Sequence, residues 1–221
     1  MRKVAVVTGC SYGLGFEIAD RLIDEGYFVY GLSRSAPPQK LSSYPDTFVW
    51  CECDITKPED VTAAIKHIGT YIDVLVNNAG AFEFGSFEQF TSKKIDKIID
   101  LNVKGTMYVT NAALDFMREE SKIIFINSVA GLYEIDNEAV YSASKHAITA
   151  FAGILGKELR NRKIKVISIH PGGMETPMQR TNPNKQTLLD PKEISSLVVD
   201  TLKSKAVYKT IKVFPESEWH Q

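Results

Sequence analysis

The chain has 221 residues, of which 44% are hydrophobic, enough for the buried core of one large α/β domain or two small ones. With 26 Lys and Arg against 27 Asp and Glu, the formal net charge is -1 and the basic residues are scattered, which argues against nucleic acid or an anionic membrane as partner. No apolar run approaches the ~18 residues that span a bilayer, and no secretion or anchoring segment is visible.

Short apolar runs rich in β-branched residues alternate with segments of helical periodicity, which is typical of repeated βα units on a parallel sheet. Seven strands are predicted at 4–7, 28–32, 48–53, 74–76, 123–126, 166–169 and 211–214. Five helices are predicted at 14–25, 58–68, 92–118, 138–159 and 191–202, whereas 33–46 carries three prolines and is too broken for a full helix. No linker or repeat divides the chain, so we expect one α/β domain, 1–221, with a doubly wound parallel sheet between two helical layers.

The three cysteines form an odd set, and Cys51 and Cys53 are spaced to share one face of a strand, where bridging is difficult. We therefore predict free thiols in a reducing cytoplasm. Cys51 and Cys53 resemble half of a metal site, but no second half with suitable spacing exists, so no metal is expected. His146 and His170 lack partners at ligand spacing and are interpreted as structural.

A glycine-rich segment, Thr8-Gly9-Cys10-Ser11-Tyr12-Gly13-Leu14-Gly15, lies between the first predicted strand and the first predicted helix. Glycines at this place let backbone N–H groups approach a pyrophosphate, and the helix N-terminus adds partial positive charge. A glycine-rich turn also serves simply as a tight turn. The strand before it and the helix after it favour a phosphate-bearing ligand.

The spacing TGxxxGxG resembles the short-chain dehydrogenase/reductase family, and later segments follow in that family's order. They are Asn77-Asn78-Ala79-Gly80, Asn102, Ser128, Tyr141-Ser142-Ala143-Ser144-Lys145 and Pro171-Gly172. The resemblance covers residues 3 to 202. It implies a Rossmann-type fold and an oxidoreductase that moves a hydride between nicotinamide and a carbonyl or secondary alcohol.

Tyr141 and Lys145 are four residues apart, so on a helix an ammonium stands one turn from a phenol and favours its ionisation. Such a pair also occurs on ordinary helix surfaces, but Ser128 and the glycine-rich loop favour a catalytic role. The resemblance implies that Tyr141 is the general acid/base, that Ser128 binds the reacting oxygen and that Lys145 binds the nicotinamide ribose. Asn102 would complete a water-linked proton relay through Lys145, although on its own it would be interpreted as structural.

The resemblance also implies a set of cofactor-binding residues. They are Gly9, Ser11, Tyr12, Gly13, Leu14, Ser33, Arg34, Ser35, Asp54, Ile55, Asn78, Ala79, Gly80, Tyr141, Lys145, Pro171, Gly172 and Thr176. For Asp54, a helix cap before Pro58 is an equal alternative to an adenine contact.

The end of the second predicted strand bears on the choice of cofactor. Ser33 stands where an NAD site carries an acidic residue, and Arg34 offers a planar fork of donors for a 2′-phosphate, with hydroxyls of Ser33 and Ser35 beside it. NADP(H) is therefore expected in preference to NAD(H). A solvated Arg34 is the alternative, and Tyr12 stands where some NADP-preferring relatives carry a basic residue.

The substrate is expected to be a small ketone, aldehyde or secondary alcohol, because only about thirteen residues separate Thr176 from Asp190 and leave a short lid. Phe82, Phe84, Tyr133, Met174 and Met178 follow strand ends and line either an apolar pocket or the core. The family resemblance implies a homodimer through 92–118 and 138–159, with a tetramer as alternative; the tail from 208 lacks the family's Gly-rich ending. An NADP(H)-sensing regulatory protein on the same fold is the alternative function.

Overall fold

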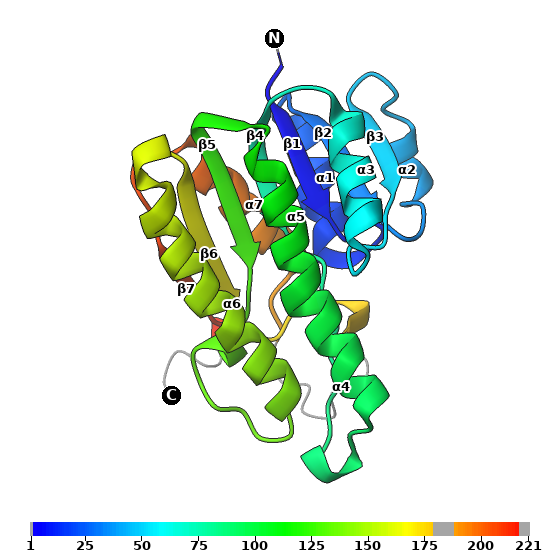
Figure 1. Cartoon of the computed structure of the whole chain (residues 1–221), viewed down its shortest axis with the longest axis vertical. Helices are drawn as coiled ribbons and strands as arrows, with labels where there is room; N and C mark the ends of the chain where they lie inside the picture. Colours follow the sequence, from blue (N-terminus) through cyan, green and yellow to red (C-terminus); the bar gives the residue numbers. More distant parts are fainter. Residues whose placement is uncertain (1, 179–187, 217–221) are drawn as a thin grey trace.

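A computed structural model describes residues 2–178 and 188–216 of the chain, and its centre is one parallel sheet of seven strands in the order β3-β2-β1-β4-β5-β6-β7 (Figure 1). The strands are β1 (Val4–Thr8), β2 (Phe28–Ser33), β3 (Phe48–Glu52), β4 (Ile72–Asn77), β5 (Met117–Ile126), β6 (Lys165–Pro171) and β7 (Thr210–Val213). Every predicted strand is present, which confirms the predicted α/β class with its doubly wound parallel sheet.

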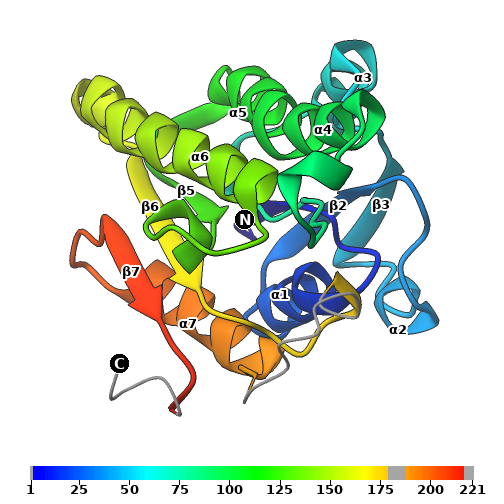
Figure 2. The same ribbon diagram turned by 90° about the horizontal axis from the view of Figure 1, so that it is seen from below.

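Helices cover both faces of this sheet. The α-helices are α1 (Gly13–Asp24), α2 (Gln39–Ser42), α3 (Pro58–Ile68), α4 (Ser92–Ile99), α5 (Thr106–Leu114), α6 (Ala139–Glu158) and α7 (Pro191–Lys203). Seen along the sheet in Figure 2, α3, α5 and α6 lie on one face and α1 and α7 on the other. The described part of the chain therefore has the three layers that the sequence predicts.

Two apolar cores hold the layers together because the central strands are buried on both faces, as expected for a parallel sheet. In β1, Val6 contributes to the core under α3, α5 and α6, while Ala5 and Val7 contribute to the core under α1 and α7. Successive side chains of a strand point to opposite faces, so an unbroken apolar run such as Val4–Thr8 serves both cores.

The strand order reverses between β1 and β4. From β1 the chain adds β2 and β3 on one side, and then returns to place β4 on the other side of β1. At such a switch point the loops that leave neighbouring strands diverge and open a crevice at the carboxyl ends of the strands. The topology therefore places a ligand crevice next to the glycine-rich loop that follows β1.

One predicted helix is wrong in both its length and its regularity. The segment predicted as a helix over 92–118 consists of α4, a π-helical stretch at Asp100–Gly105 and α5, and α5 ends at Leu114. The backbone turns after Ala113, whose carbonyl accepts from Phe116 N, and Met117 is already the first residue of β5. Polar residues between 115 and 120 continue a helical composition, so the sequence carries no stop signal there.

The remaining sequence features concern the cysteines, the proline-rich stretch and the membrane. Cys10, Cys51 and Cys53 are free and buried, as predicted. The proline-rich stretch after β2 holds only the four-residue helix α2. Within residues 2–178 and 188–216, none of the helices has the length and apolar character needed to cross a membrane.

Candidate functional site

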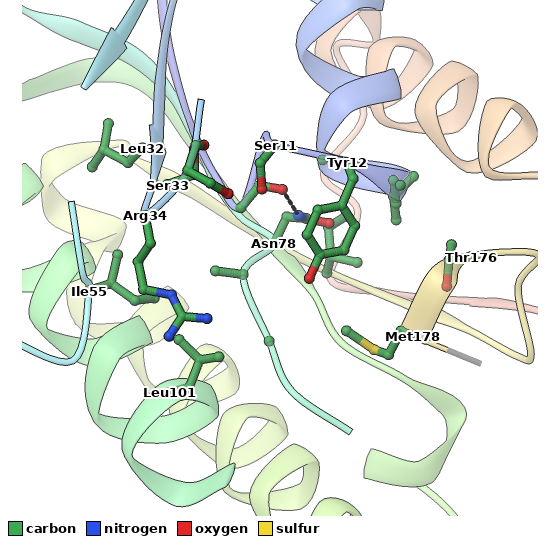
Figure 3. A pocket seen from close by; sticks show the side chains of 18 of the residues that line it. Ser11, Tyr12, Leu32, Ser33, Arg34, Ile55, Asn78, Leu101, Thr176 and Met178 are labelled. Atoms are coloured by element: carbon green, nitrogen blue, oxygen red, sulfur yellow. Dashed lines mark hydrogen bonds between the residues drawn. The ribbon is translucent and has the colours of Figure 1, made fainter. Parts of the chain in front are cut away.

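A cleft of about 1030 Å³, including its opening to solvent, lies at the carboxyl ends of the strands around the switch point (Figure 3). It is lined by Gly9, Ser11, Tyr12, Gly13, Leu14, Gly15, Leu32, Ser33, Arg34, Ser35, Cys53, Asp54, Ile55, Asn78, Ala79, Gly80, Leu101, Ile126, Asn127, Tyr141, Lys145, Met174, Thr176 and Met178. The lining runs from the glycine-rich loop and the end of β2 to Tyr141 and Lys145 on α6, so one cleft joins the predicted phosphate loop to the predicted catalytic pair.

The glycine-rich loop packs too closely against its surroundings for larger residues. Gly9 has a φ of +70°, and a Cβ there would stand 2.9 Å from the backbone of Ala79. A Cβ at Gly15 would stand 2.2 Å from the carbonyl oxygen of Gly9. Only glycine at both positions lets the loop turn tightly into α1, and this brings the first N–H groups of the helix to the cleft.

The N-terminus of α1 is open to an anion. Its N-cap residue, Tyr12, makes no side-chain cap hydrogen bond, and the first turn holds no acidic residue. The uncapped N–H groups and the helix dipole together favour a phosphate group at this place. The loop therefore fits the pyrophosphate of a dinucleotide cofactor.

The loop is tied to the end of β4 by Thr8 and Asn78. The Thr8 hydroxyl accepts from the backbone N–H groups of Asn78 and Ala79, each at 3.0 Å, and the Asn78 amide donates to the carbonyl oxygens of Thr8 at 3.0 Å and Gly9 at 3.3 Å. Asn78 lies in the middle of the cleft in Figure 3. These contacts hold the two sides of the switch point in one fixed arrangement.

Ser33 and Arg34 at the end of β2 differ in how far their donors are engaged. The Ser33 hydroxyl donates to the Ser35 carbonyl at 2.8 Å and accepts from Trp50 Nε1 at 3.1 Å, so its one proton is already used. Arg34 is exposed, extends between Ile55 and Leu101 in Figure 3, and has no hydrogen bond or ion pair to the described residues. Contrary to the sequence expectation, the donors left for an anion come from Arg34 and not from Ser33.

Asp54 organises the loop after β3. Its carboxylate accepts from the Thr56 backbone N–H at 3.0 Å and from the Thr56 hydroxyl at 2.8 Å. Burial works to raise the pKa of Asp54, but these hydrogen bonds and the nearby Arg34 charge outweigh it and leave the pKa lowered. The N-cap of α3 is Lys57, so the helix-cap alternative for Asp54 is wrong, and its carboxylate lines the cleft beside Arg34.

Tyr141 and Lys145 reach the other end of the cleft from α6. Both are buried, with 9% and 7% of their surface exposed, and the Lys145 ammonium lies 5.6 Å from the centre of the Tyr141 ring. Lys145 Nζ donates to the Ile126 carbonyl at 3.1 Å, and the Phe82 ring meets the Tyr141 ring edge-on with centroids 4.9 Å apart. The phenol and the ammonium therefore face each other in a pocket closed by the loop after β4.

Burial sets the protonation of this pair. It raises the pKa of Tyr141, against which a side-chain hydrogen bond with Ser128 acts, and it lowers the pKa of Lys145 to about 8. This differs from the expectation that Lys145 lowers the pKa of the phenol. In this arrangement the phenol keeps its proton at neutral pH and is ready to donate it.

Ser128 is held from two sides at the end of β5. Its hydroxyl oxygen accepts from the Ala130 N–H at 3.1 Å, which leaves the hydroxyl proton for the hydrogen bond with the Tyr141 phenol. Its carbonyl lies 2.9 Å from His170 Nδ1, and His170 Nε2 lies 2.8 Å from the Ser168 hydroxyl. His170 is fully buried, and burial lowers its pKa, so a neutral imidazole fixes the Ser128 backbone.

Asn102 lies in the π-helical stretch and does not reach Lys145. Its amide donates to the Ala81 carbonyl at 2.9 Å and to the Ser144 hydroxyl at 3.0 Å, while its oxygen accepts from the Ala81 N–H at 2.7 Å. Asn102 therefore links the loop after β4 to α6. The water-linked relay that the resemblance implies is not tested by these contacts.

The cleft gathers most of the residues named from the sequence. Those outside its lining are Asn102, Ser128, Pro171 and Gly172. Pro171 ends β6, and Gly172 N donates to the Val213 carbonyl, so both belong to the sheet edge beside the cleft. Of the five apolar residues considered for a substrate pocket, Met174 and Met178 line the cleft.

Several lining residues were missed from the sequence, among them Leu101, Ile126 and Asn127. Asn127 carries a detectable signal, since a polar residue directly after a buried strand and before Ser128 stands at a strand's carboxyl end. Its amide donates to the Thr149 hydroxyl at 2.9 Å and helps to hold α6 against β5. Leu101 has no such signal, because a leucine in a helix is read as core.

The model of the family described as short chain dehydrogenase matches residues 3–187. An uncharacterised oxidoreductase of Staphylococcus epidermidis is 35% identical over 210 residues, which is 90% of each chain.

Two solved structures of dehydrogenases and reductases are similar to the chain over most of its length. A short chain dehydrogenase from Burkholderia cenocepacia in complex with NADP superposes with a TM-score of 0.87 at 26% identity and covers 96% of each chain. A 3-ketoacyl-(acyl-carrier-protein) reductase from Brucella melitensis complexed with NADH has a TM-score of 0.89 at 25% identity, again over 96% of each chain.

Proposed function

The chain belongs to the short-chain dehydrogenase family of oxidoreductases, and on that basis we propose that it is an NADP(H)-dependent enzyme that interconverts a carbonyl compound and its secondary alcohol. The observation that carries this proposal is that Tyr141 and Lys145 line one end of the cleft whose other end is lined by the glycine-rich loop, while Ser128 is hydrogen-bonded to Tyr141. A bound nicotinamide cofactor would supply or accept the hydride. Its phosphates would be held by Gly9, Ser11 and Gly13 at the N-terminus of α1.

The protein's own residues transfer the proton. In reduction, Tyr141 donates its phenolic proton to the carbonyl oxygen of the substrate, and the Ser128 hydroxyl turns its proton from Tyr141 to hydrogen-bond the same oxygen. As the phenolate forms, the Lys145 ammonium 5.6 Å from the ring stabilises its charge. Burial makes this stabilisation stronger than it would be in water, and the reverse sequence serves oxidation.

Asn102 has a positioning role in this proposal. Its amide holds the backbone of Ala81, which leads directly to Phe82 against the Tyr141 ring. Asn102 therefore positions Phe82, whose ring packs against the phenol of Tyr141. The water-linked relay through Lys145 stays a prediction, because the hydrogen bonds of the Asn102 side chain do not test it.

The preference for NADP(H) rests on the end of β2. Arg34 has free donors at the mouth of the cleft, and neither Ser33 nor Ser35 presents the carboxylate that accepts both ribose hydroxyls in NAD sites. Asp54 stands nearby, but Thr56 engages its carboxylate. A 2′-phosphate would therefore meet a guanidinium and no opposing free acid at the strand end.

The test is a panel of small ketones, aldehydes and secondary alcohols read by NADPH absorbance, with NADH alongside. Turnover is expected with NADPH, and Tyr141→Phe should lower it by ~10²- to 10⁴-fold while the dissociation constant for NADPH changes little. Near-normal turnover by Tyr141→Phe would contradict the assigned role. Tight NADPH binding without turnover of any compound would favour a sensing protein.

A further inference from the structure

Glu138 is a buried acid without a partner. It is 7% exposed, and within residues 2–178 and 188–216 its side chain makes no hydrogen bond and no ion pair. Other buried charges are better compensated: Lys122 donates to three backbone carbonyls at the end of α7, and one oxygen of Asp20 accepts from Lys40 at 2.6 Å, although its other oxygen is buried without a partner. Largely burying a carboxyl without a partner costs free energy, and the Glu138 oxygens are not among the fully enclosed ones, so a ligand can reach them.

The backbone places Glu138 one helix turn before Tyr141 on α6. Glu138 is the N-cap residue of α6, and its carbonyl accepts from Ser142 N at 2.7 Å, which fixes the first turn. Residues three apart on a helix are neighbours with Cβ atoms about 5–6 Å apart, and Tyr141 is three residues on. On the other side, Gly85 N donates to the Asn137 carbonyl at 2.9 Å, so the loop that carries Phe82 against Tyr141 is tied to the residue before Glu138.

The charges around Glu138 give it no compensation. Burial raises its pKa to about 7, and its negative charge contributes to raising the pKa of Tyr141, which shows that the two groups are electrostatically coupled. The preceding loop adds two further acids, Glu134 and Asp136, both exposed. Lys212, which reaches this loop from β7, donates to the Tyr133 hydroxyl at 2.7 Å.

We propose that Glu138 binds a hydrogen-bond donor of the substrate, an ammonium or hydroxyl group close to the reacting carbon, so that amino ketones and hydroxy ketones are preferred over plain ketones. The proposal rests on the proposed function, since Tyr141 must face the same substrate. A donor within reach of both residues sits one or two atoms from the carbonyl carbon. An ammonium would balance the buried carboxylate directly, and a hydroxyl would satisfy one of its oxygens.

Three aryl ketones test this recognition: propiophenone, 2-hydroxyacetophenone and 2-aminoacetophenone, which differ only in a methyl, hydroxyl or ammonium group at one position. The three ketones differ in intrinsic reactivity, so kcat/KM for the hydroxy ketone and for the amino ketone is each divided by kcat/KM for propiophenone. The readout is how much each of these two ratios changes between the natural protein and a variant. Glu138→Leu should reduce both ratios by ~10-fold or more. Glu138→Gln, which keeps an acceptor but no charge, should reduce the ammonium ratio and largely keep the hydroxyl ratio.

A second measurement does not need turnover. With NADP⁺ present, 2-aminoacetophenone should raise the Tm of the natural protein more than propiophenone does, and Glu138→Gln should remove that difference. If this holds without any NADPH oxidation, the proposed reaction fails and the role of Glu138 stands. The role of Glu138 is overturned if both ratios stay unchanged in both variants, or if every ketone gives the same Tm. In that case, continued reduction of propiophenone would leave the proposed reaction intact.

Discussion

At the end of β2, the free guanidinium of Arg34 allows a direct test of cofactor choice. A hydrogen bond to a charged group contributes ~1.5–3 kcal/mol, so Arg34→Ala should weaken NADPH binding roughly 10- to 100-fold and leave NADH binding nearly unchanged. Titration of both cofactors into both proteins gives the four dissociation constants. Arg160→Ala, which removes an exposed arginine outside the cleft lining, is the matched control, and equal NADPH affinity before and after Arg34→Ala would show that the 2′-phosphate is read elsewhere or not at all.

His170 is a second residue whose role can be separated from packing. Because the Ser128 carbonyl can only accept, Nδ1 of His170 carries the proton, and Nε2 then accepts from the Ser168 hydroxyl. This assigns one neutral tautomer to a side chain that the sequence left as simply structural. Through it, β6 fixes the backbone of the residue that we propose binds the reacting oxygen.

Replacement of His170 should therefore affect turnover more than cofactor binding. His170→Leu leaves the Ser128 carbonyl unpaired and should lower kcat by ~10- to 100-fold through misplacement of the hydroxyl. His170→Asn, whose amide can reproduce the Nδ1 donor, should recover much of that loss. Steady-state kinetics with unfolding curves for both variants decide the matter: equal loss of kcat in Asn and Leu variants of equal stability would rule out the donor as the cause.

At the scale of elements, the π-helical stretch between α4 and α5 carries a contact that spans three segments. Asn102 connects it to Ala81 after β4 and to Ser144 in α6, and only 2% of Asn102 is exposed. π-helical turns inside α-helices are rare and are often found at functional sites. An extra residue in the turn displaces the Asn102 side chain from the regular helical face and toward Ala81.

Asn102→Ala should destabilise the protein by about 1–3 kcal/mol, since it leaves the N–H and the carbonyl of the half-buried Ala81 without their side-chain partners. Thr62→Ala on α3 is a suitable control, because that hydroxyl bonds only the Pro58 carbonyl at an exposed position. Urea unfolding of the three proteins measures the difference. A loss for Asn102→Ala no larger than for the control would show that the link between these segments is unimportant.

The elements themselves were largely predictable. All seven strands were found because apolar β-branched runs buried on both faces leave a continuous signal, and α3 was predicted at its observed bounds because Pro58 opens it and Gly69 follows it. The overrun of the helix at 92–118 has a physical reason. Phe116 and Met117 lie beyond the helix end because they pair with Ile72 of the sheet. No neighbouring residue in the sequence indicates this pairing.

The candidate site was predictable where short motifs act through the backbone or through one helix turn. The glycine-rich loop, Asn78 and the pair Tyr141 and Lys145 all line the cleft. The roles of Ser33 and Asn102 were not predictable in detail, since both depend on partners far along the chain, Trp50 and Ala81. Glu138 escaped for the same reason: its burial follows from how the loop after β4 closes over α6.

For the whole molecule, the outer face of α6 is the surface that stands out. Its exposed residues recur mostly at intervals of three or four positions, and five of the eight are small or apolar, namely Ala139, Ala143, Ala150, Gly153 and Ile154; the others are His146, Lys157 and Glu158. Ile154 is 55% exposed, and a Cβ at Gly153 would meet nothing within 4 Å. Small residues let a second helix approach closely, and Ile154 offers an apolar contact at the centre of the face.

We expect this face, with the neighbouring α4 and α5, to pair two copies of the chain as a homodimer, since a two-fold contact sets the same surface against itself. Ile154→Lys should then give a monomer, because two copies would bring both new ammonium groups together at the centre of the contact. Sedimentation at micromolar concentration measures this. Ala150→Ser, a mild change on the same face, is the control. A monomeric natural protein would refute the expectation. A tetramer that Ile154→Lys converts to a dimer would instead show a second interface elsewhere, and the exposed edge of β7 is the first candidate for it.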